Sequence, residues 1–120
     1  MKTADVIIVG SGASGLFNAL FLPKDYKVIV ITKKEVEESD SFLAQGGISA
    51  LKNPEDYDSY FEDTMKAGHY ENDKGAVEKM IKESPQIIQD LKDFGVRFDL
   101  KDGEIEFTRE GGHSTFRILH

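Results

Sequence analysis

The densest group of reactive side chains lies in residues 108–120, TREGGHSTFRILH. A glycine pair separates Glu110 from His113, and a third candidate, His120, ends the segment. A carboxylate here could hold an ammonium group through a charge-assisted hydrogen bond. The two histidines have no acid or cysteine partners at ligand spacing, so the segment does not predict a metal site. It is either part of an active site or a solvated tail.

The remaining charged residues have ordinary explanations. Arg109 and Arg117 could bind the carboxylates of a substrate, but arginines beside a loop more often form structural ion pairs. For His113, lining a substrate site and a structural role are equally open. The acidic stretch Asp56–Asp58 is interpreted as a solvated face.

A second candidate site is the phosphate turn, Gly10-Ser-Gly12-Ala-Ser-Gly15, a G-x-G-x-x-G pattern. The first glycine permits a tight turn, the second lets the backbone approach a pyrophosphate, and the third allows close helix–strand packing. The helix that follows offers free N–H groups and a positive dipole end. An ordinary glycine-rich turn is the alternative, but the position of the pattern between a strand and a helix favours dinucleotide binding.

The elements around this turn form a βαβ unit. Residues 6–9 are a continuous β-branched run, typical of a strand buried on both faces of a parallel sheet. Residues 13–22 carry apolar side chains at helical spacing, and Pro23 ends that helix. Residues 27–31 are the second buried strand. The sequence therefore predicts an α/β, Rossmann-like fold.

Beyond the second strand, the pattern predicts an ordered loop at 39–47, followed by helices and a short hairpin. Asn53-Pro54 predicts a helix start and Gly68 its end. A second helix is predicted from Asp73 to a cap at Gly95, and Pro85 is expected to kink or split it. The strands of the hairpin are predicted at residues 96–98 and 104–107.

Composition narrows the function classes. Of 120 residues 39% are apolar, and 15 basic against 22 acidic residues give a net charge of −7. An acidic chain without a basic run is a poor candidate for nucleic acid or an anionic membrane. Without cysteine there is no thiol catalysis, and we expect a cytoplasmic protein. No apolar run is long enough to span a membrane.

Two further motifs point to a known family. The second strand ends in Thr32-Lys33, where most NAD-binding folds carry an acid, and the loop 40–49 reads DSFLAQGGIS. Together with the phosphate turn and the TREGGH segment, these motifs resemble the succinate dehydrogenase and fumarate reductase flavoprotein family, and within it the branch that oxidises L-aspartate. The resemblance runs from about Thr3 to His120. The alternative for the loop is a plain surface loop.

The resemblance implies FAD as cofactor. The residues implied to bind it are those of the phosphate turn, the second strand end and the loop: Gly10, Ser11, Gly12, Ala13, Ser14, Gly15, Thr32, Lys33, Asp40, Ser41, Phe42, Leu43, Ala44, Gln45, Gly46 and Gly47. In the respiratory members a histidine five residues before the glutamine tethers FAD covalently. That position is Asp40 here, so the FAD is expected to be non-covalent.

The resemblance also implies a substrate. The aspartate-oxidising branch has a glutamate before the late Gly-Gly, and here it is Glu110; His113 is the second candidate substrate residue. A fixed anion would repel a plain dicarboxylate but can hold the ammonium of aspartate. The implied reaction is oxidation of L-aspartate to iminoaspartate, the first step of de novo NAD synthesis, with O2 (forming H2O2) or fumarate as acceptor and quinolinate synthase as a candidate partner. A soluble fumarate reductase and a stand-alone nucleotide-binding module are the alternatives.

Family members are several times longer than this chain. We therefore expect residues 1–120 to be the N-terminal part of an FAD-binding domain, without the capping and C-terminal helical domains. The arginine that acts as acid and base in the family lies in the capping domain, so no catalytic residue is assigned here. Taken alone, the chain is expected to be inactive.

Overall fold

The computed structural model describes residues 3–44 and 46–120. The chain divides into two compact units, Met1–Gln45 and Gly46–His120. The first holds the phosphate turn and the second holds the TREGGH segment, so each candidate site is described within its own unit.

The first unit is built on a βαβ motif, as predicted. Its elements in chain order are β1 (Val6–Val9), α1 (Ala13–Phe21), β2 (Val28–Ile31), the 3-10 turn η1 (Val36–Glu38) and α2 (Asp40–Leu43). The strands β1 and β2 are parallel, with Val6 opposite Val28 and Val9 opposite Ile31. Helix α1 ends just before Pro23, which cannot continue it. The α/β prediction is confirmed.

The segment predicted as an irregular loop contains a short helix. Ser39 caps α2, because its hydroxyl accepts a hydrogen bond from the amide of Phe42 at 3.2 Å. The prediction missed this turn because a helix this short has no room for a hydrophobic period. The remaining part of the loop runs into the second unit.

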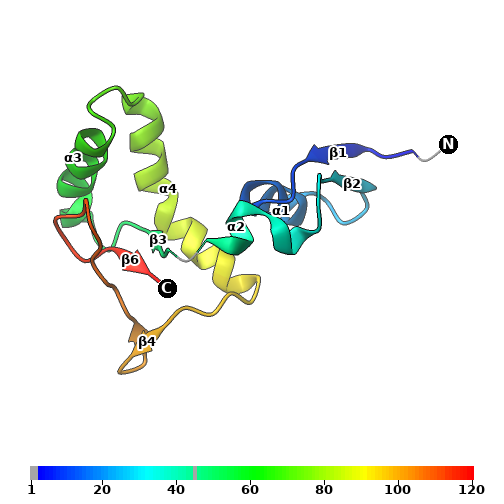
Figure 1. Ribbon diagram of the computed structural model, residues 1–120. Coiled ribbons are helices and arrows are strands. Elements are labelled where there is room, and N and C mark those ends of the chain that lie inside the picture. The colour runs from blue at the N-terminus through cyan, green and yellow to red at the C-terminus, as the bar shows by residue number, and fades with distance from the viewer. Residues whose placement is uncertain (1–2, 45) are drawn as a thin grey trace. The chain divides into compact units, whose positions relative to one another are not determined.

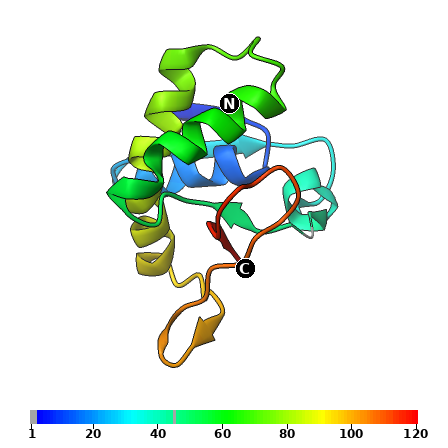
Figure 2. The same ribbon diagram turned by 90° about the vertical axis from the view of Figure 1, so that its left-hand side faces the viewer.

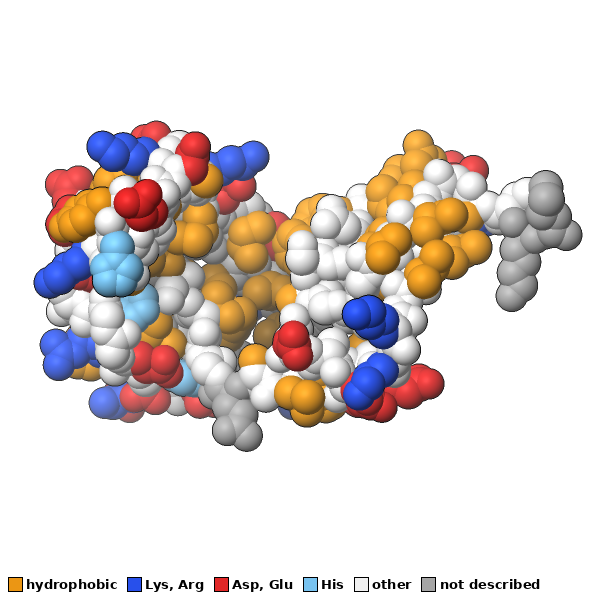
Figure 3. Space-filling view, turned by 45° about the horizontal axis from the view of Figure 1, so that its top comes forward, with side chains coloured by type: hydrophobic (Ala, Val, Ile, Leu, Met, Phe, Trp, Pro, Cys, Tyr) orange, Lys and Arg blue, Asp and Glu red, His pale blue; other side chains and the backbone are white. Residues whose placement is uncertain are grey.

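The strands of the first unit are more exposed than their composition predicts. Ile7 is 59% exposed and Val9 83% exposed, so the expectation that β1 is buried on both faces is wrong for this chain. Among the described residues, β1 pairs with β2 alone. Figure 3 shows apolar side chains at the surface of this unit.

The second unit contains two helices and short strands. Its elements are β3 (Ile48–Ser49), the 3-10 turn η2 (Pro54–Asp56), α3 (Tyr57–Ala67), α4 (Lys74–Asp93), β4 (Leu100–Lys101), β5 (Glu104–Ile105) and β6 (Ile118–Leu119). The side chain of Asn53 caps η2 by accepting from the amide of Asp56 at 3.1 Å, and Asp73 caps α4. Helices α3 and α4 lie side by side (Figure 1).

Pro85 does not split α4, which runs unbroken over 20 residues. Proline at this position has no N–H for the carbonyl of Ile81, four residues earlier. The hydroxyl of Ser84 donates to that carbonyl instead, at 2.8 Å, and accepts from the amide of Leu51 at 2.8 Å. One hydroxyl thus satisfies the carbonyl that Pro85 leaves free and fixes α4 to the chain before η2.

The short strands differ in position from the prediction. The hairpin exists, but its first strand is β4 rather than residues 96–98. Its turn places Asp102 and Gly103 at positive φ, 55° and 87°, so the register follows the turn. In Figure 2 the hairpin, in orange, projects beyond the end of α4. The antiparallel pair β3–β6 was not predicted.

Two apolar clusters form the core of the second unit. Tyr60, Met65, Val77 and Ile81 pack between α3 and α4. Ala50, Ile88 and Leu119 join β6 to the second half of α4. The TREGGH segment therefore leads into a strand, β6, whose two residues are both buried.

Candidate functional site

The phosphate turn has the backbone geometry that its glycines allow. Gly10 has a φ of +111°, a conformation that other residues rarely adopt. A Cβ atom on Gly15 would overlap the carbonyl oxygen of Gly10 and would lie 3.4 Å from Cγ2 of Ile8. Helix α1 can therefore start directly against the turn and β1 only if position 15 is glycine.

The start of α1 offers donors for an anion. Within the described residues, the amides of Ser11 and Gly12 donate to no other protein group. The Ala13 amide is used: it donates to Oγ of Ser41 at 3.0 Å. A Cβ atom on Gly12 would lie 3.1 Å from that same oxygen. The turn thus leaves two backbone donors without a described protein acceptor at the N-terminus of α1, with Ser41 beside them.

A cavity of about 350 Å³ joins three of the predicted segments. It is lined by residues 10–12 of the phosphate turn, residues 32–35 after β2 and residues 38–40 before and in α2. The hydroxyl of Ser11, buried to 4% exposure, donates to Oγ1 of Thr32 at 2.8 Å and so fixes the turn to the end of β2. The phosphate turn, Thr32-Lys33 and Asp40 therefore border one space.

The other predicted loop residues lie outside this cavity. Phe42 and Leu43 on α2 are 61% and 63% exposed, and Ala44 is exposed too. Gln45 lies outside the described residues. Gly46 and Gly47 belong to the second unit, where a Cβ atom on Gly47 would overlap the carbonyl oxygen of Leu119.

The cavity fits the pyrophosphate end of a dinucleotide. Two backbone amides, the helix dipole and the Lys33 ammonium group supply positive charge, and the side-chain-free Gly12 permits close approach. The hydroxyl of Thr32 and the lysine replace the usual ribose-binding acid. The residues present thus suit a bound FAD.

Glu110 and His113 are the two ends of one turn but make different contacts. The amide of His113 donates to the carbonyl of Glu110 at 3.3 Å, and Gly112 has a φ of +85°. The Glu110 carboxylate lies 3.5 Å from Nε2 of His120. The His113 ring instead faces Nη1 of Arg117, 3.2 Å from its Nδ1. The structure brings the two residues into one turn and not into one contact.

The tautomer of His113 follows from its partner. The guanidinium of Arg117 can only donate, so Nδ1 of His113 accepts and its ring proton is on Nε2. The ring borders cavities of about 480 and 410 Å³ that Asp63 and Gly112 also line. His113 thus offers a neutral N–H donor beside open space.

Arg117 has a structural role. It is fully buried and donates to both oxygens of Asp56, at 3.0 and 2.8 Å, and to Asp63 at 2.6 Å. Its guanidinium carbon also lies 4.7 Å from the ring centroid of Tyr60. We name Arg117, Asp56 and Asp63 the buried ion cluster. It leaves Arg117 no free edge for a substrate.

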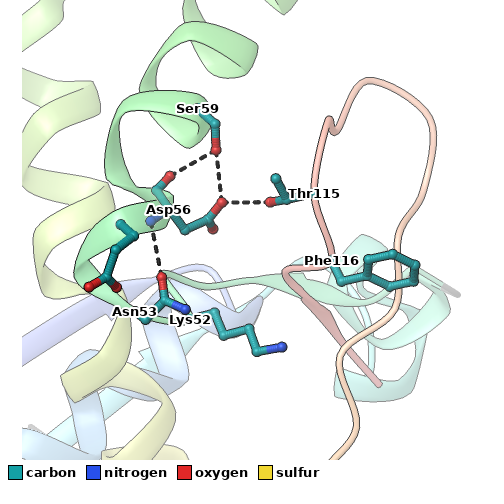
Figure 4. A pocket seen from close by; sticks show the side chains of 7 residues that line it. Lys52, Asn53, Asp56, Ser59, Thr115 and Phe116 are labelled. Atoms are coloured by element: carbon teal, nitrogen blue, oxygen red, sulfur yellow. Dashed lines mark hydrogen bonds between the residues drawn. The ribbon is translucent and has the colours of Figure 1, made fainter.

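The structure corrects the interpretation of Asp56 as a solvated residue. Asp56 was assigned to a solvated face, yet it is only 8% exposed. Figure 4 shows its carboxylate turned toward Ser59 and Thr115, both of which donate to it. A pocket of about 450 Å³ beside it is also lined by Asn53 and Phe116. The charge of Asp56 is therefore matched inside the fold.

The cluster shifts the pKa values of its members. Burial alone would raise the pKa of Asp56, but hydrogen bonds from Arg117, Thr115 and Ser59 outweigh it and lower the pKa from 3.8 to about 2. Burial likewise opposes the lowering of the Asp63 pKa, which the bonds from Arg117 and Ser114 bring about. The same two carboxylates raise the pKa of Arg117 against its burial. All three groups are charged at neutral pH.

Sequence reasoning favoured a structural ion pair for Arg117 but missed its burial and its partners, although one signal of the burial was available. Arg117 stands between Phe116 and the apolar pair Ile118–Leu119, in a run whose strand is buried. A buried arginine requires carboxylate partners. Their identity was not readable, because Asp56 and Asp63 lie 61 and 54 residues away in the chain.

No group of three or more metal-ligating side chains occurs among the described residues. No described helix has the length and apolar character needed to cross a bilayer.

This chain is similar to known proteins in both sequence and structure. The chain is 45% identical over 97% of its length to L-aspartate oxidase of Clostridium acetobutylicum, and 44% identical over 97% to that of Synechocystis. It covers 27% and 21% of these relatives, so it spans about a quarter of their length.

Solved structures agree. Mycobacterium smegmatis Sdh1 in complex with UQ1 matches 99% of the chain, and 21% of that protein, with a TM-score of 0.84 and 31% identity. A flavocytochrome c3 fumarate reductase in an open conformation matches 98% of the chain, and 22% of its own, with a TM-score of 0.82 and 25% identity. A family model described as FAD binding domain matches residues 5–120. The chain belongs to this FAD-binding family, and its cofactor is FAD.

Proposed function

We propose that this chain is the N-terminal part of an L-aspartate oxidase, which converts L-aspartate to iminoaspartate. Iminoaspartate formation is the first step of de novo NAD synthesis, and quinolinate synthase would consume the product. Similarity to L-aspartate oxidases over 97% of the chain supports the proposal. The observation that carries the proposal is the Glu110 carboxylate, which within the described chain has only the partly exposed His120 as an ion-pair partner. Glu110 lies in the second unit, which also holds Gly46-Gly47.

The phosphate turn would hold the cofactor. The amides of Ser11 and Gly12 and the ammonium of Lys33 would bind the pyrophosphate, and Ser41 would stand beside it. Asp40, at the position of the covalent tether in respiratory members, has no nucleophilic imidazole, so the cofactor would be held by these contacts alone. When bound, FAD supplies the acceptor for the two electrons that leave the substrate, and O2 or fumarate regenerates it.

The substrate residues would orient the bond that breaks. The Cα–H bond of aspartate breaks with its electron pair, and the nitrogen loses a proton as the C=N bond forms. Glu110 would hold the ammonium group and so fix Cα, and the Nε2–H of His113 would donate to a carboxylate of the substrate. We assign no acid–base residue within the described chain.

The test is Glu110→Gln in the full-length enzyme that carries this sequence. Loss of one charge-assisted contact, about 1.5–3 kcal/mol, should lower kcat/KM for aspartate roughly 10- to 150-fold. Reduction of fumarate, which has no amine, should fall far less. The matched control is Glu106→Gln, which removes an acid four residues before Glu110.

A soluble fumarate reductase is the alternative, and the similar solved structures include a flavocytochrome c3 fumarate reductase. If the enzyme is a fumarate reductase, the unaltered protein should reduce fumarate and should not oxidise aspartate. Equal losses of both activities in Glu110→Gln would mean that Glu110 is structural.

A further inference from the structure

His120 lies between Glu110 and Gly47, which belongs to the part of the predicted FAD-binding loop that lies in the second unit. Its Cε1 would be 3.0 Å from a Cβ atom on Gly47, so the ring lies against the backbone of that loop. Its Nε2 is 3.5 Å from Oε1 of Glu110. The ring therefore connects a glycine expected at the flavin with a carboxylate expected at the substrate.

Thr108 fixes the orientation of this ring. Its hydroxyl donates to the carbonyl of Ile118 at 3.3 Å, which leaves its oxygen to accept from Nε2 of His120 at 3.0 Å. Nε2 consequently carries a proton whether or not the ring is charged. The same N–H lies within reach of Glu110, and ring protonation would add a full positive charge to this contact.

The charged groups around the ring are few in this part of the chain. Glu110 is in contact with it, and Arg109 precedes Glu110 but lies over the ring of Phe116, 5.7 Å from its centroid. The amide of Asp99 donates to the carbonyl of His120 at 2.7 Å. The paired strand β3 carries no titratable side chain. Glu110 is thus the charged side chain in contact with the ring.

We infer that His120 is a positioning residue for Glu110: it holds the carboxylate near Gly47 and, when protonated, competes with the substrate ammonium for that carboxylate. The inference rests on the proposed function, because it gives Glu110 the ammonium as its ligand. A charged His120 and an ammonium group would share one carboxylate and repel each other, so substrate binding would weaken as the ring gains its proton.

The kinetic test compares His120→Gln with the unaltered full-length enzyme. Glutamine keeps an N–H donor but cannot take up a proton. We expect KM for aspartate to rise about threefold or more toward acid pH in the unaltered enzyme and to stay flat in His120→Gln. His69→Gln, at an exposed histidine beyond α3, should keep the acid rise. An unchanged acid rise in His120→Gln would overturn the inference.

A second measurement does not depend on activity. In the nuclear magnetic resonance spectrum of this chain, the His120 ring signals should move in Glu110→Gln and stay in place in Glu106→Gln. Ring signals that ignore Glu110→Gln would overturn the inference even if aspartate is oxidised. Absence of aspartate oxidation in the unaltered enzyme, with the ring signals still responding, would overturn the proposed function and leave the contact standing.

Discussion

Asp56→Asn tests the buried ion cluster. The substitution keeps the shape of a side chain that accepts two hydrogen bonds from Arg117 but removes its charge. A fall of the Asp56 pKa from 3.8 to about 2 corresponds to about 2 kcal/mol of stability in the native state. Breaking a buried pair outright costs about 3–5 kcal/mol, but Asp63 still faces the guanidinium. We therefore expect a loss of about 2–3 kcal/mol near neutral pH.

The direction of the Asp56 pKa shift determines how this loss of stability depends on pH. Because folding lowers the pKa of Asp56, its contribution is complete above the unfolded value of 3.8 and is lost as the pH falls toward about 2. The difference between the unaltered chain and Asp56→Asn should be constant above about pH 5 and shrink below about pH 4.

The assay is urea unfolding of this chain followed by far-ultraviolet circular dichroism, which reports mainly on α3 and α4. Asp58→Asn is the matched control, since Asp58 lies two residues away, exposed in the first turn of α3, and should change stability by less than about 0.5 kcal/mol. If Asp56→Asn lowers the free energy of unfolding no more than Asp58→Asn does, or if it lowers it equally at acid and neutral pH, the cluster does not stabilise the fold in this way.

Two predictions concern the cofactor. Gly12→Val in the full-length enzyme should abolish FAD binding, since even a Cβ atom at this position would lie 3.1 Å from Oγ of Ser41, and Gly12→Ala should show an intermediate loss. The flavin absorbance of the purified variants measures FAD occupancy. Full occupancy in Gly12→Val would show that the glycine serves the turn alone. Because Asp40 has no imidazole to form a tether, acid precipitation should leave free FAD in the supernatant, and flavin that stays with the pellet would contradict non-covalent binding.

The local elements were predictable because their signals are local. The β-branched runs on either side of the phosphate turn, and the caps Asn53 and Asp73, mark their elements within a few residues. The hairpin was found from its turn residues, but its first strand was misplaced, since Val96–Phe98 has the better β propensity while the Asp102–Gly103 turn sets the register.

The long-range features were not predictable. The pairing of β3 with β6 joins segments of two residues each, too short for any period. The exposure of β1 depends on which strands pair with it, and its sequence does not record that. In the site, the phosphate turn and Thr32-Lys33 were expected near one another and share one cavity. The partners of Arg117 and the contact of His120 with Glu110 required the fold itself.

The hydroxyl of Ser84 has a consequence for how this sequence can change over time. Pro85 is tolerated because that hydroxyl serves the carbonyl of Ile81, so the two positions are not independent. Loss of Ser84 while proline remains leaves a buried carbonyl and the amide of Leu51 without partners. Replacing proline first restores a backbone donor, after which serine matters to Leu51 alone. An evolutionary path through position 85 is therefore open, whereas one that begins at position 84 is closed.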